Sequence, residues 1–293
     1  MDIYYTIFDL QKAILVYRKQ GASIGFVPTM GALHQGHLSL IKKAKQENDI
    51  VVCSIFVNPV QFNNKEDFEK YPHTENEDIQ LLNQANCDLL FTPSEKEIYP
   101  DSTHNNFDFN FGDIDKVMEG KYRPGHFKGV AIVVKRLLEI VLPNKAYFGE
   151  KDFQQLAIVK VLAKQFFPTI DIVPCPIIRE ADGLAMSSRN MRLTIEERKV
   201  VSLIYKTLFE AKTKAQSNTV FDLKHWVEGE INAQPLMNLE YFEISDIETL
   251  KPIEKWVESQ CVIACIAVFI GKVRLIDNII IEKKNDANRG FKV

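Results

Sequence analysis

The sequence predicts an α/β protein in two parts, a doubly wound parallel sheet followed by a second, smaller α+β part. Strand-like and helix-like segments alternate as far as about residue 173, which is typical of a parallel sheet with helices on both faces. The run 49–57 is almost continuously apolar, as expected of a strand that is covered on both faces. After about residue 178 the order changes to helices followed by strands. We therefore place the domain boundary between 1–177 and 178–293.

The elements of the first part follow from local patterns. Residues 8–20 have helical spacing and are followed by Gly21, a common signal at a helix C-terminus. Ligands of a doubly wound sheet bind beyond the carboxyl ends of its strands, so the turns that follow the strands are where we expect a site. Short apolar runs predict strands at 24–27, 49–57, 87–91, 146–148 and 170–173. Further helices are expected at 37–45, 76–86, 154–166 and 126–142, the last of them ended by Pro143.

The second part contains two predicted helices and three predicted strands. Thr194-Ile-Glu-Glu197 is a capping box, which we expect to open one long helix that runs to about residue 216. A second helix is expected near 221–233. Strands are expected at about 239–245, 261–269 and 273–282, separated by polar breaks that are typical of hairpins. The polar tail, 283–293, is expected to be frayed.

Composition and charge favour a protein that acts on small molecules. The chain has 293 residues, of which 46 % are hydrophobic, with a net charge of −3 and a pI of about 6.1. Such a chain has no basic field for a nucleic-acid backbone. Its five cysteines are odd in number and form no C-x-x-C pair, which disfavours a disulfide framework or a zinc ribbon. No targeting segment is visible, and no apolar run is long enough to span a bilayer as a helix, so we expect a cytoplasmic protein without a membrane partner.

The most informative segment is Pro28-Thr-Met-Gly-Ala-Leu-His34-Gln-Gly36-His37, at a predicted strand-to-helix turn. Free backbone N–H groups and the helix dipole at such a turn favour an anion. The segment is not a Walker loop, because His37 and Leu38 stand where lysine and Ser/Thr are required. His34 and His37 are expected to share one face of a helical turn, and Gly36 to leave room for a close approach to the backbone. The alternatives are two unrelated surface histidines or a zinc pair, for which no third ligand is found.

Two further segments carry groups that suit a phosphate. Tyr147-Phe-Gly149-Glu-Lys151-Asp152-Phe-Gln-Gln155 again links a predicted strand to a helix, and Lys151 is a compact cation for phosphate oxygens. Asp152 is alternatively the N-cap of that helix. The segment Arg179-Glu-Ala-Asp-Gly183-Leu-Ala-Met186-Ser187-Ser188-Arg189-Asn190 places two hydroxyls and a guanidinium after a glycine turn, which suits a mobile phosphate clamp. An ordinary interdomain linker is the alternative for this segment.

Together these segments resemble a known family. The His-x-Gly-His and Met-Ser-Ser-Arg elements are similar to the two signature motifs of the nucleotidyltransferase superfamily, which has a Rossmann-like fold and includes class I aminoacyl-tRNA synthetases. The residues around them narrow the resemblance to the pantothenate synthetase (pantoate–β-alanine ligase) family. It extends in order over nearly the whole chain, through Phe56-Val-Asn-Pro-Val-Gln61-Phe, Tyr71-Pro, Arg123-Pro-Gly-His126-Phe, Phe148-Gly-Glu-Lys-Asp, Asp182-Gly-Leu-Ala-Met-Ser-Ser-Arg-Asn190 and Arg274-Leu-Ile-Asp-Asn278.

The resemblance implies an ATP-dependent ligase that joins pantoate to β-alanine through a pantoyl adenylate and releases AMP and pyrophosphate. It also implies Mg²⁺ bound with ATP, and a homodimer. His37, His34 and Lys151 are the implied catalytic residues. The implied ligands of pantoate and β-alanine are Gln61 and Gln155, with Asn58, Tyr71, Arg123 and His126 as neighbours. The residues implied in ATP binding are Met30, Gly31, Ala32, Leu33, His34, Gln35, Gly36, His37, Gly149, Glu150, Lys151, Asp152, Ile178, Met186, Ser187, Ser188 and Arg189.

Two expectations join this resemblance to the chemistry of the substrates. The gem-dimethyl carbon of pantoate needs an apolar wall, which Pro28, Met30 and Phe56 could supply. An acyl adenylate must be protected from water, and we expect the second domain to act as a lid that closes over it.

Two departures from the family pattern concern the metal. His73 follows Tyr71-Pro72 where arginine is expected, and the next acidic cluster, Glu75-Asn-Glu77-Asp78, is not made mainly of aspartates. Relatives use such acids near magnesium, but magnesium commonly binds substrate phosphates and water. We therefore assign no protein ligand to the metal.

Three other functions compete with the ligase. A nucleotidyltransferase that keeps AMP on its product would share the first motif but would not need Gln61 together with Gln155. A nucleotide-binding regulator with a decayed site is disfavoured by the intact His34, His37 and Lys151. A tRNA-charging enzyme is disfavoured by the negative net charge and by the lack of any segment that resembles an anticodon-binding domain.

Overall fold

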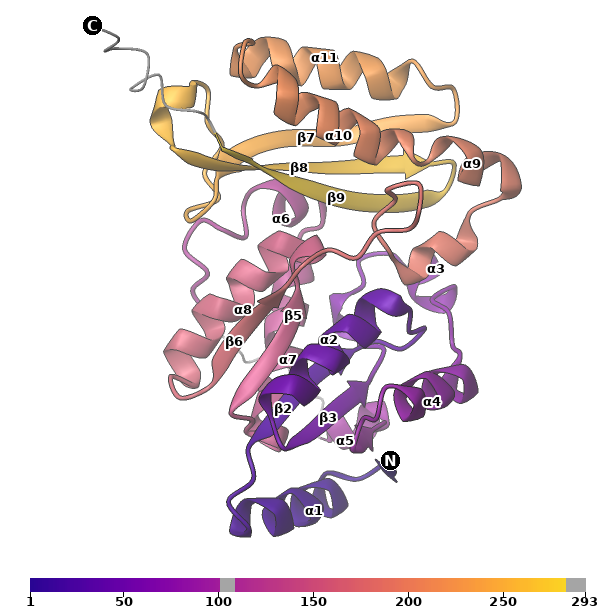
Figure 1. The fold of residues 1–293 in the computed structure, drawn as a ribbon, viewed down its shortest axis with the longest axis vertical. Helices are drawn as coiled ribbons and strands as arrows, with labels where there is room; N and C mark the ends of the chain where they lie inside the picture. The colour runs from indigo at the N-terminus through magenta and orange to yellow at the C-terminus, as the bar shows by residue number, and fades with distance from the viewer. Residues whose placement is uncertain (101–108, 283–293) are drawn as a thin grey trace, which may run out of the picture. The chain divides into compact units, whose positions relative to one another are not determined.

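A computed structural model describes residues 1–100 and 109–282 of the chain (Figure 1). The tail that was expected to be frayed, 283–293, lies outside these described residues. The chain forms two compact units. The first contains residues 1–179 together with 186–190, and the second contains residues 180–185 together with the described residues from 191 onward.

The first unit is built on a parallel sheet of six strands in the order β1-β4-β3-β2-β5-β6. This arrangement confirms the predicted doubly wound sheet. Strand β1 was not predicted, because three residues are too short to show a period. The strands are β1 (Asp2–Tyr4), β2 (Ile24–Thr29), β3 (Ile50–Ile55), β4 (Leu89–Phe91), β5 (Lys145–Gly149) and β6 (Asp171–Cys175).

The predicted helices of this unit are confirmed, with ends that differ by a few residues. They are α1 (Ile7–Lys19), α2 (Gln35–Glu47), α4 (Glu75–Gln84), α7 (His126–Val141) and α8 (Phe153–Phe166). Helix α7 ends where Leu142 adopts a left-handed conformation, directly before Pro143. The short elements were not predicted; they are η1 (Pro59–Gln61), α3 (Lys65–Glu69), α5 (Glu95–Ile98), α6 (Met118–Tyr122) and η3 (Glu150–Asp152).

Each face of the sheet has its own apolar core. On one face, Phe26 and Phe148 pack with side chains of α1, α7 and α8. On the other face, Val27 and Tyr147 pack with side chains of α2 and α4. Successive residues of a strand thus point into different cores, which explains the almost continuous apolar runs in the sequence.

Strands β2 and β5 are neighbours at the centre of the sheet, and the chain order reverses between them. From β2 the chain winds outward through β3 and β4, and it then returns to the other side of β2 as β5 before it reaches β6. Such a point is the preferred ligand site of an open parallel sheet. The loops that follow β2 and β5 carry the first two motifs found in the sequence.

The second unit packs helices on an antiparallel sheet of three strands, in the order β7-β8-β9. The prediction of one long helix over 194–216 is wrong. The chain turns at Val201 and Ser202, both buried, where the N–H of Ile204 donates to the carbonyl of Val201 in a tighter i→i+3 turn. The elements are α9 (Ile195–Val200), α10 (Leu203–Lys214), α11 (Val220–Asn232), β7 (Met237–Asp246), β8 (Cys261–Ile270) and β9 (Val273–Glu282).

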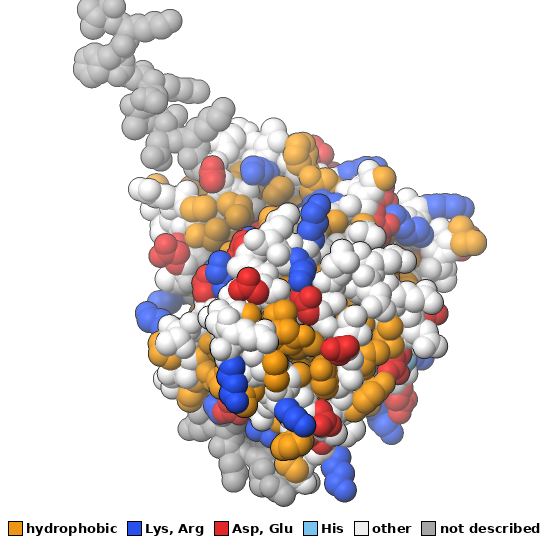
Figure 2. Space-filling view, turned by 60° about the horizontal axis from the view of Figure 1, so that its bottom comes forward, with side chains coloured by type: hydrophobic (Ala, Val, Ile, Leu, Met, Phe, Trp, Pro, Cys, Tyr) orange, Lys and Arg blue, Asp and Glu red, His pale blue; other side chains and the backbone are white. Residues whose placement is uncertain are grey.

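Helix α1 buries only a narrow stripe of its surface. Leu10 and Ile14 are buried, whereas Phe8, Leu15 and Val16 are exposed at 74 %, 51 % and 52 %. Figure 2 shows exposed hydrophobic side chains gathered among charged ones on one face of the molecule. No helix within the described ranges is long and apolar enough to cross a membrane.

The five cysteines are free thiols. Cys53, Cys87, Cys175 and Cys265 are buried, and Cys261 is partly buried at the start of β8. Burial raises the pKa of the Cys87 thiol to about 12. Desolvation thus keeps this thiol protonated, as expected of a core residue.

Candidate active site

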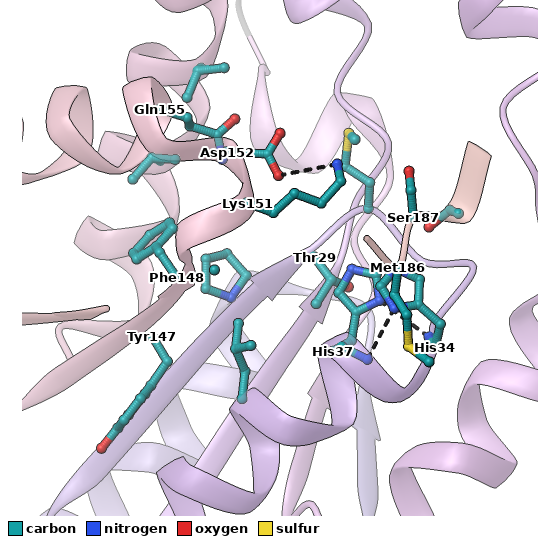
Figure 3. Close-up of a pocket in the computed structure, with 18 of the residues that line it drawn as sticks. Thr29, His34, His37, Tyr147, Phe148, Lys151, Asp152, Gln155, Met186 and Ser187 are labelled. Carbon is teal, nitrogen blue, oxygen red and sulfur yellow. Dashed lines mark hydrogen bonds and ion pairs between the residues drawn. The ribbon is translucent and has the colours of Figure 1, made fainter. Parts of the chain in front are cut away.

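A pocket in the first unit gathers most of the residues that the sequence singles out (Figure 3). It lies at the loops that follow β2 and β5. The site residues that line it are Met30, His34, Gly36, His37, Gln61, Gly149, Lys151, Asp152, Gln155, Ile178, Met186, Ser187, Ser188 and Arg189. The residues assigned to ATP that do not line it are Gly31, Ala32, Leu33, Gln35 and Glu150.

His34 and His37 lie together, with ring centroids 4.0 Å apart. They were expected to meet because both would lie on one face of a helical turn. His34 is instead outside the helix, as the N-cap residue of α2 with an extended backbone. The Nδ1 atom of His34 accepts from the N–H of Gly36 at 3.1 Å, and the Nδ1 atom of His37 accepts from the N–H of His34 at 3.3 Å. The two rings thus form a reciprocal capping box at the start of α2.

These two hydrogen bonds fix the tautomers of the rings. A backbone N–H can only donate, so Nδ1 is the acceptor in each ring, and the proton of each neutral imidazole is on Nε2. The pKa of His37 lies well below its usual 6.5, because the ring is desolvated and because positive charge on His34 and Lys151 disfavours a further cation. At neutral pH, His37 is therefore a neutral ring with an Nε2–H donor.

Gly36 leaves room for a close approach to the backbone, and the group that approaches is the ring of His34. A Cβ atom at this position would lie 2.8 Å from Cε1 and 2.9 Å from Nδ1 of His34. The space beside Gly36 is therefore filled by the His34 ring.

The expectation of free N–H groups in the loop after β2 is wrong for five of its residues, the first of which is Gly31, whose N–H donates to the hydroxyl of Thr29 at 3.3 Å. The N–H groups of Ala32 and Leu33 donate to the carboxylate of Asp78, at 2.9 and 2.7 Å. Those of His34 and Gly36 donate to the imidazoles. These N–H groups therefore already have acceptors within the chain, and the ring Nε2–H groups replace them as candidates to face an anion.

The loop after β5 brings a cation to the same pocket. Lys151 lies in η3, and its ammonium is 3.9 Å from the carboxylate of Asp152 (Figure 3). Asp152 is at the N-cap position of α8, but its side chain makes no capping hydrogen bond, and half of it is exposed. A Cβ atom on Gly149 would meet no atom within 4 Å, so the backbone is open there.

The segment 186–189 forms another wall, and it is held at both ends. The N–H of Met186 donates to the carbonyl of Ile178 at 2.9 Å. The buried hydroxyl of Ser188 donates to the carbonyl of Ala32 at 2.9 Å. The guanidinium of Arg189 pairs with Asp67 at 2.8 Å and lies over the ring of Tyr71, so this part of the predicted clamp is anchored to the first unit.

Gln61 is fixed by a buried amide network. Its Oε1 accepts from Nδ2 of Asn58 at 3.2 Å, and its Nε2 contacts the sulfur of Met30 at 2.8 Å. Nδ2 of Asn58 also donates to the carbonyl of Gly129 in α7, and its Oδ1 accepts from the hydroxyl of Tyr99. Both amides are therefore pre-oriented, with Asn58 and Gln61 at the edge of the pocket.

Arg123 and His126 were expected beside the substrate, but they lie behind Gln61 and do not line the pocket. The guanidinium of Arg123 can only donate, so it donates to Nε2 of His126 at 3.1 Å. Nδ1–H of His126 then donates to the backbone carbonyl of Gln61 at 2.8 Å. His126 is buried, and its pKa is lowered to about 4, first by desolvation and then by Arg123.

The apolar wall of the pocket includes Pro28, Met30 and Phe56, as expected, and extends further than predicted. One side of helix α7 also contributes Val130, Val133, Val134 and Leu137. The sequence signal for this wall was present, because the helix is apolar on nearly all sides and so must be buried. The pattern could not show which of its residues meet the pocket.

The donor set of the pocket does not fit a metal ion held by protein groups. Within residues 1–100 and 109–282, no group of three or more His, Cys, Asp or Glu side chains could hold one. Among the described residues that line the pocket, Asp152 is the only carboxylate. Both oxygens of Asp78 already accept from the loop after β2, and Glu77 is exposed on α4.

Comparison with known proteins gives one consistent answer. The family model of pantoate-beta-alanine ligase matches residues 2–280. A pantothenate synthetase of Bacteroides fragilis (strain YCH46) is 49 % identical over 279 residues, which cover 95 % of this chain and 98 % of the relative. A pantothenate synthetase of Phocaeicola vulgatus is 50 % identical over 280 residues, with 95 % and 99 % covered.

Solved structures agree with these relatives. A crystal structure of pantothenate synthetase from Thermus thermophilus is 40 % identical, with a TM-score of 0.86, and the match covers 95 % of this chain and 99 % of that one. A crystal structure of pantoate-beta-alanine ligase from Francisella tularensis, complexed with beta-gamma ATP and beta-alanine, is 41 % identical. Its TM-score is 0.79, and 95 % and 97 % of the two chains are covered.

Proposed function

This chain belongs to the pantoate-β-alanine ligase family, and we propose that its pocket joins pantoate to β-alanine with ATP, through a pantoyl adenylate. The observation that carries the proposal is the histidine pair at the point where the sheet reverses its winding. Two imidazoles with their protons on Nε2 lie in one pocket with the ammonium of Lys151. This set of donors suits the phosphates of a nucleotide.

We propose that ATP binds along the loops after β2 and β5 and against the segment 186–189. His34 and His37 donate to phosphate oxygens through their Nε2–H groups, and His37 does so as a neutral ring, because a proton on it is disfavoured in its site. Lys151 contributes an ammonium, and the hydroxyl of Ser187 and the guanidinium of Arg189 complete the set. The backbone near Ile178 receives the adenine, and Asp152 faces the ribose.

Pantoate is proposed to lie against Gln61 and Gln155. Each amide both donates and accepts, so it matches a hydroxyl-bearing carboxylate. Gln61 is held in one orientation by Asn58, which limits the entropy lost on binding. The apolar surface of Pro28, Met30 and Phe56, extended by α7, suits the gem-dimethyl carbon.

The first step is nucleophilic attack by a carboxylate oxygen of pantoate on the α-phosphorus of ATP. The bond from this phosphorus to the β-phosphate bridging oxygen breaks, and pyrophosphate leaves. The chain supplies no nucleophile; it aligns the two substrates and balances the charge that grows on the phosphate oxygens. We propose that His37 and Lys151 make the strongest contribution.

The second step is attack by the neutral amine of β-alanine on the acyl carbon. The carbon–oxygen bond to the phosphate breaks, AMP leaves, and the amine loses a proton to form the amide. The pocket must exclude water between the two steps. The second unit is proposed to act as the lid, which stays a prediction from the sequence.

Magnesium is proposed to enter with ATP, on phosphate oxygens and water, because the described pocket has no carboxylate cage for it. It would neutralise phosphate charge when bound. No residue of the chain is assigned to it. A homodimeric state and a cytoplasmic location also stay predictions.

The test is to incubate the protein with Mg·ATP and pantoate, with and without β-alanine, and to identify the nucleotide product. We expect AMP and pyrophosphate to form steadily only when both acids are present. ADP would show phosphoryl transfer and would refute adenylation. Pyrophosphate with AMP retained on the product would indicate a nucleotidyltransferase instead.

A further inference from the structure

The loop between β2 and α2 has an unusual backbone. Gly31 and Ala32 have φ angles of +80° and +50°, so two successive residues are on the left-handed side. Glycine adopts this conformation at little cost, but alanine does so only where the surroundings hold it. Something in the structure must therefore stabilise the turn at Ala32.

The carboxylate of Asp78 lies on the concave side of this turn, where the N–H groups converge. Its Oδ2 accepts from the N–H of Ala32 at 2.9 Å, and its Oδ1 accepts from that of Leu33 at 2.7 Å and from the hydroxyl of Thr74 at 3.2 Å. Successive N–H groups that converge in this way form a nest, which binds an anion. Here a carboxylate of the chain, only 1 % exposed, occupies the nest.

A Cβ atom on Gly31 would lie 3.0 Å from Oδ2 of Asp78, so the carboxylate is in close contact with the turn. The turn also sets two walls of the pocket. The carbonyl of Ala32 accepts from Ser188, and the chain continues directly into His34, the N-cap of α2. Asp78 itself does not line the pocket.

We propose that Asp78 is a positioning residue: as an internal anion in the nest of Ala32 and Leu33, it holds the loop that carries His34 and His37 and anchors Ser188. The expected effect of Asp78 on turnover rests on the proposed function, whereas its effect on the loop does not. The carboxylate acts in its charged form, because both oxygens accept from N–H groups.

The test compares Asp78→Asn with the wild type. The amide offers one acceptor oxygen, and its NH₂ group then faces the second N–H, donor against donor. We expect hydrogen–deuterium exchange of the peptide that contains 30–34 to rise roughly tenfold. We expect turnover to fall roughly 10- to 100-fold at a temperature where the variant is folded, because the two imidazoles lose their alignment.

Two further variants separate positioning from simple loss of stability. Glu75→Gln removes an equal charge from the same first turn of α4, at an exposed side chain, and we expect wild-type exchange and turnover. Ala32→Gly makes the left-handed turn cheaper, so Asp78→Asn combined with it should recover at least part of the lost turnover. If Asp78→Asn does not fold, Thr74→Val, which removes one hydrogen bond to Asp78, should shift both readouts in the same direction by about twofold to fivefold.

The proposal is overturned if exchange of 30–34 stays at the wild-type rate, or if exchange rises while turnover is unchanged. It is also overturned if Ala32→Gly gives no recovery. Failure of the wild-type protein to form AMP and pyrophosphate would refute the proposed function instead, and the exchange comparison would still decide whether Asp78 holds the loop.

Discussion

Replacement of His126 by asparagine should make the first unit less sensitive to acid. Desolvation and the charge of Arg123 lower the pKa of the buried His126 to about 4. The hydrogen bond to Gln61 and the charges of Glu119 and Asp152 raise this pKa, but by less. Asparagine keeps an N–H donor for the carbonyl of Gln61 and removes the titrating ring. The native ring stays neutral between pH 6.5 and 4, whereas the ring of the unfolded chain is protonated there. Acid therefore favours unfolding, and the contribution to stability is complete above pH 6.5 and is lost as the pH falls.

The size of this effect follows from the shift. A fall in pKa from 6.5 to about 4 corresponds to roughly 3.4 kcal/mol once the pH is below both values, at 1.36 kcal/mol per unit. Between about pH 7 and pH 5 the same linkage gives a loss of about 1.8 kcal/mol. The ring is 6 % exposed, so solvent reduces this figure little. His37 titrates in the same direction, but it is present in both proteins and cancels in the comparison.

The assay is urea unfolding of both proteins at about pH 7 and pH 5. Both tryptophans, Trp226 and Trp256, lie in the second unit, so their fluorescence reports on that unit. Seven of the nine tyrosines lie in the first unit, so near-UV circular dichroism of tyrosine is the better signal. The wild type should lose about 1.8 kcal/mol more than the variant between the two pH values. Parallel losses in the two proteins would refute the reasoning, and His225→Asn, in the second unit, controls for the removal of a histidine as such.

Three further substitutions test the proposed site. Lys151→Ala should lower pantoate-dependent ATP–pyrophosphate exchange by roughly 10²- to 10³-fold with the fold intact, because a cationic donor to the phosphates is lost; an unchanged exchange rate would reject this role. Gly36→Ala should displace the ring of His34, whose nearest atom would be 2.8 Å from the new Cβ, and should lower the same exchange rate while pantoate affinity is kept. Gly129→Ala should push α7 away from η1, because the new Cβ would lie 2.7 Å from Cα of Gln61. We expect the free energy of unfolding in urea to fall by about 1–3 kcal/mol and the KM for pantoate to rise. A wild-type KM would contradict the proposed place of Gln61.

The sequence predicted the regular elements well because their physical signals are local. Apolar runs marked the buried strands, and Pro143 and Gly21 marked helix ends. The break between α9 and α10 was missed because it arises where Val201 and Ser202 are buried against the rest of the unit. Within α9 and α10 the local pattern is that of one helix.

Proximity of the site residues was predicted more reliably than the reasons for it. His34 and His37 were expected to meet through helical spacing, but they meet through a capping box outside the helix. Asp78 was considered only as one of an acidic cluster that relatives use near magnesium, and its burial was not predicted. The sequence spacing offered a signal, because Leu82 follows Asp78 by four residues and the two therefore share one face of α4. Both side chains are buried, so this is the inner face of the helix.

The path of the chain through the two units decides how the protein could be shortened. The chain leaves the first unit after residue 179, returns to it for 186–190, and leaves it again. A truncation at residue 177, where the composition changes, would remove Met186, Ser187, Ser188 and Arg189 from the wall of the pocket, and Ala32 would lose the partner of its carbonyl. A fragment meant to keep this pocket whole would have to run to at least residue 190 and carry the excursion 180–185 with it.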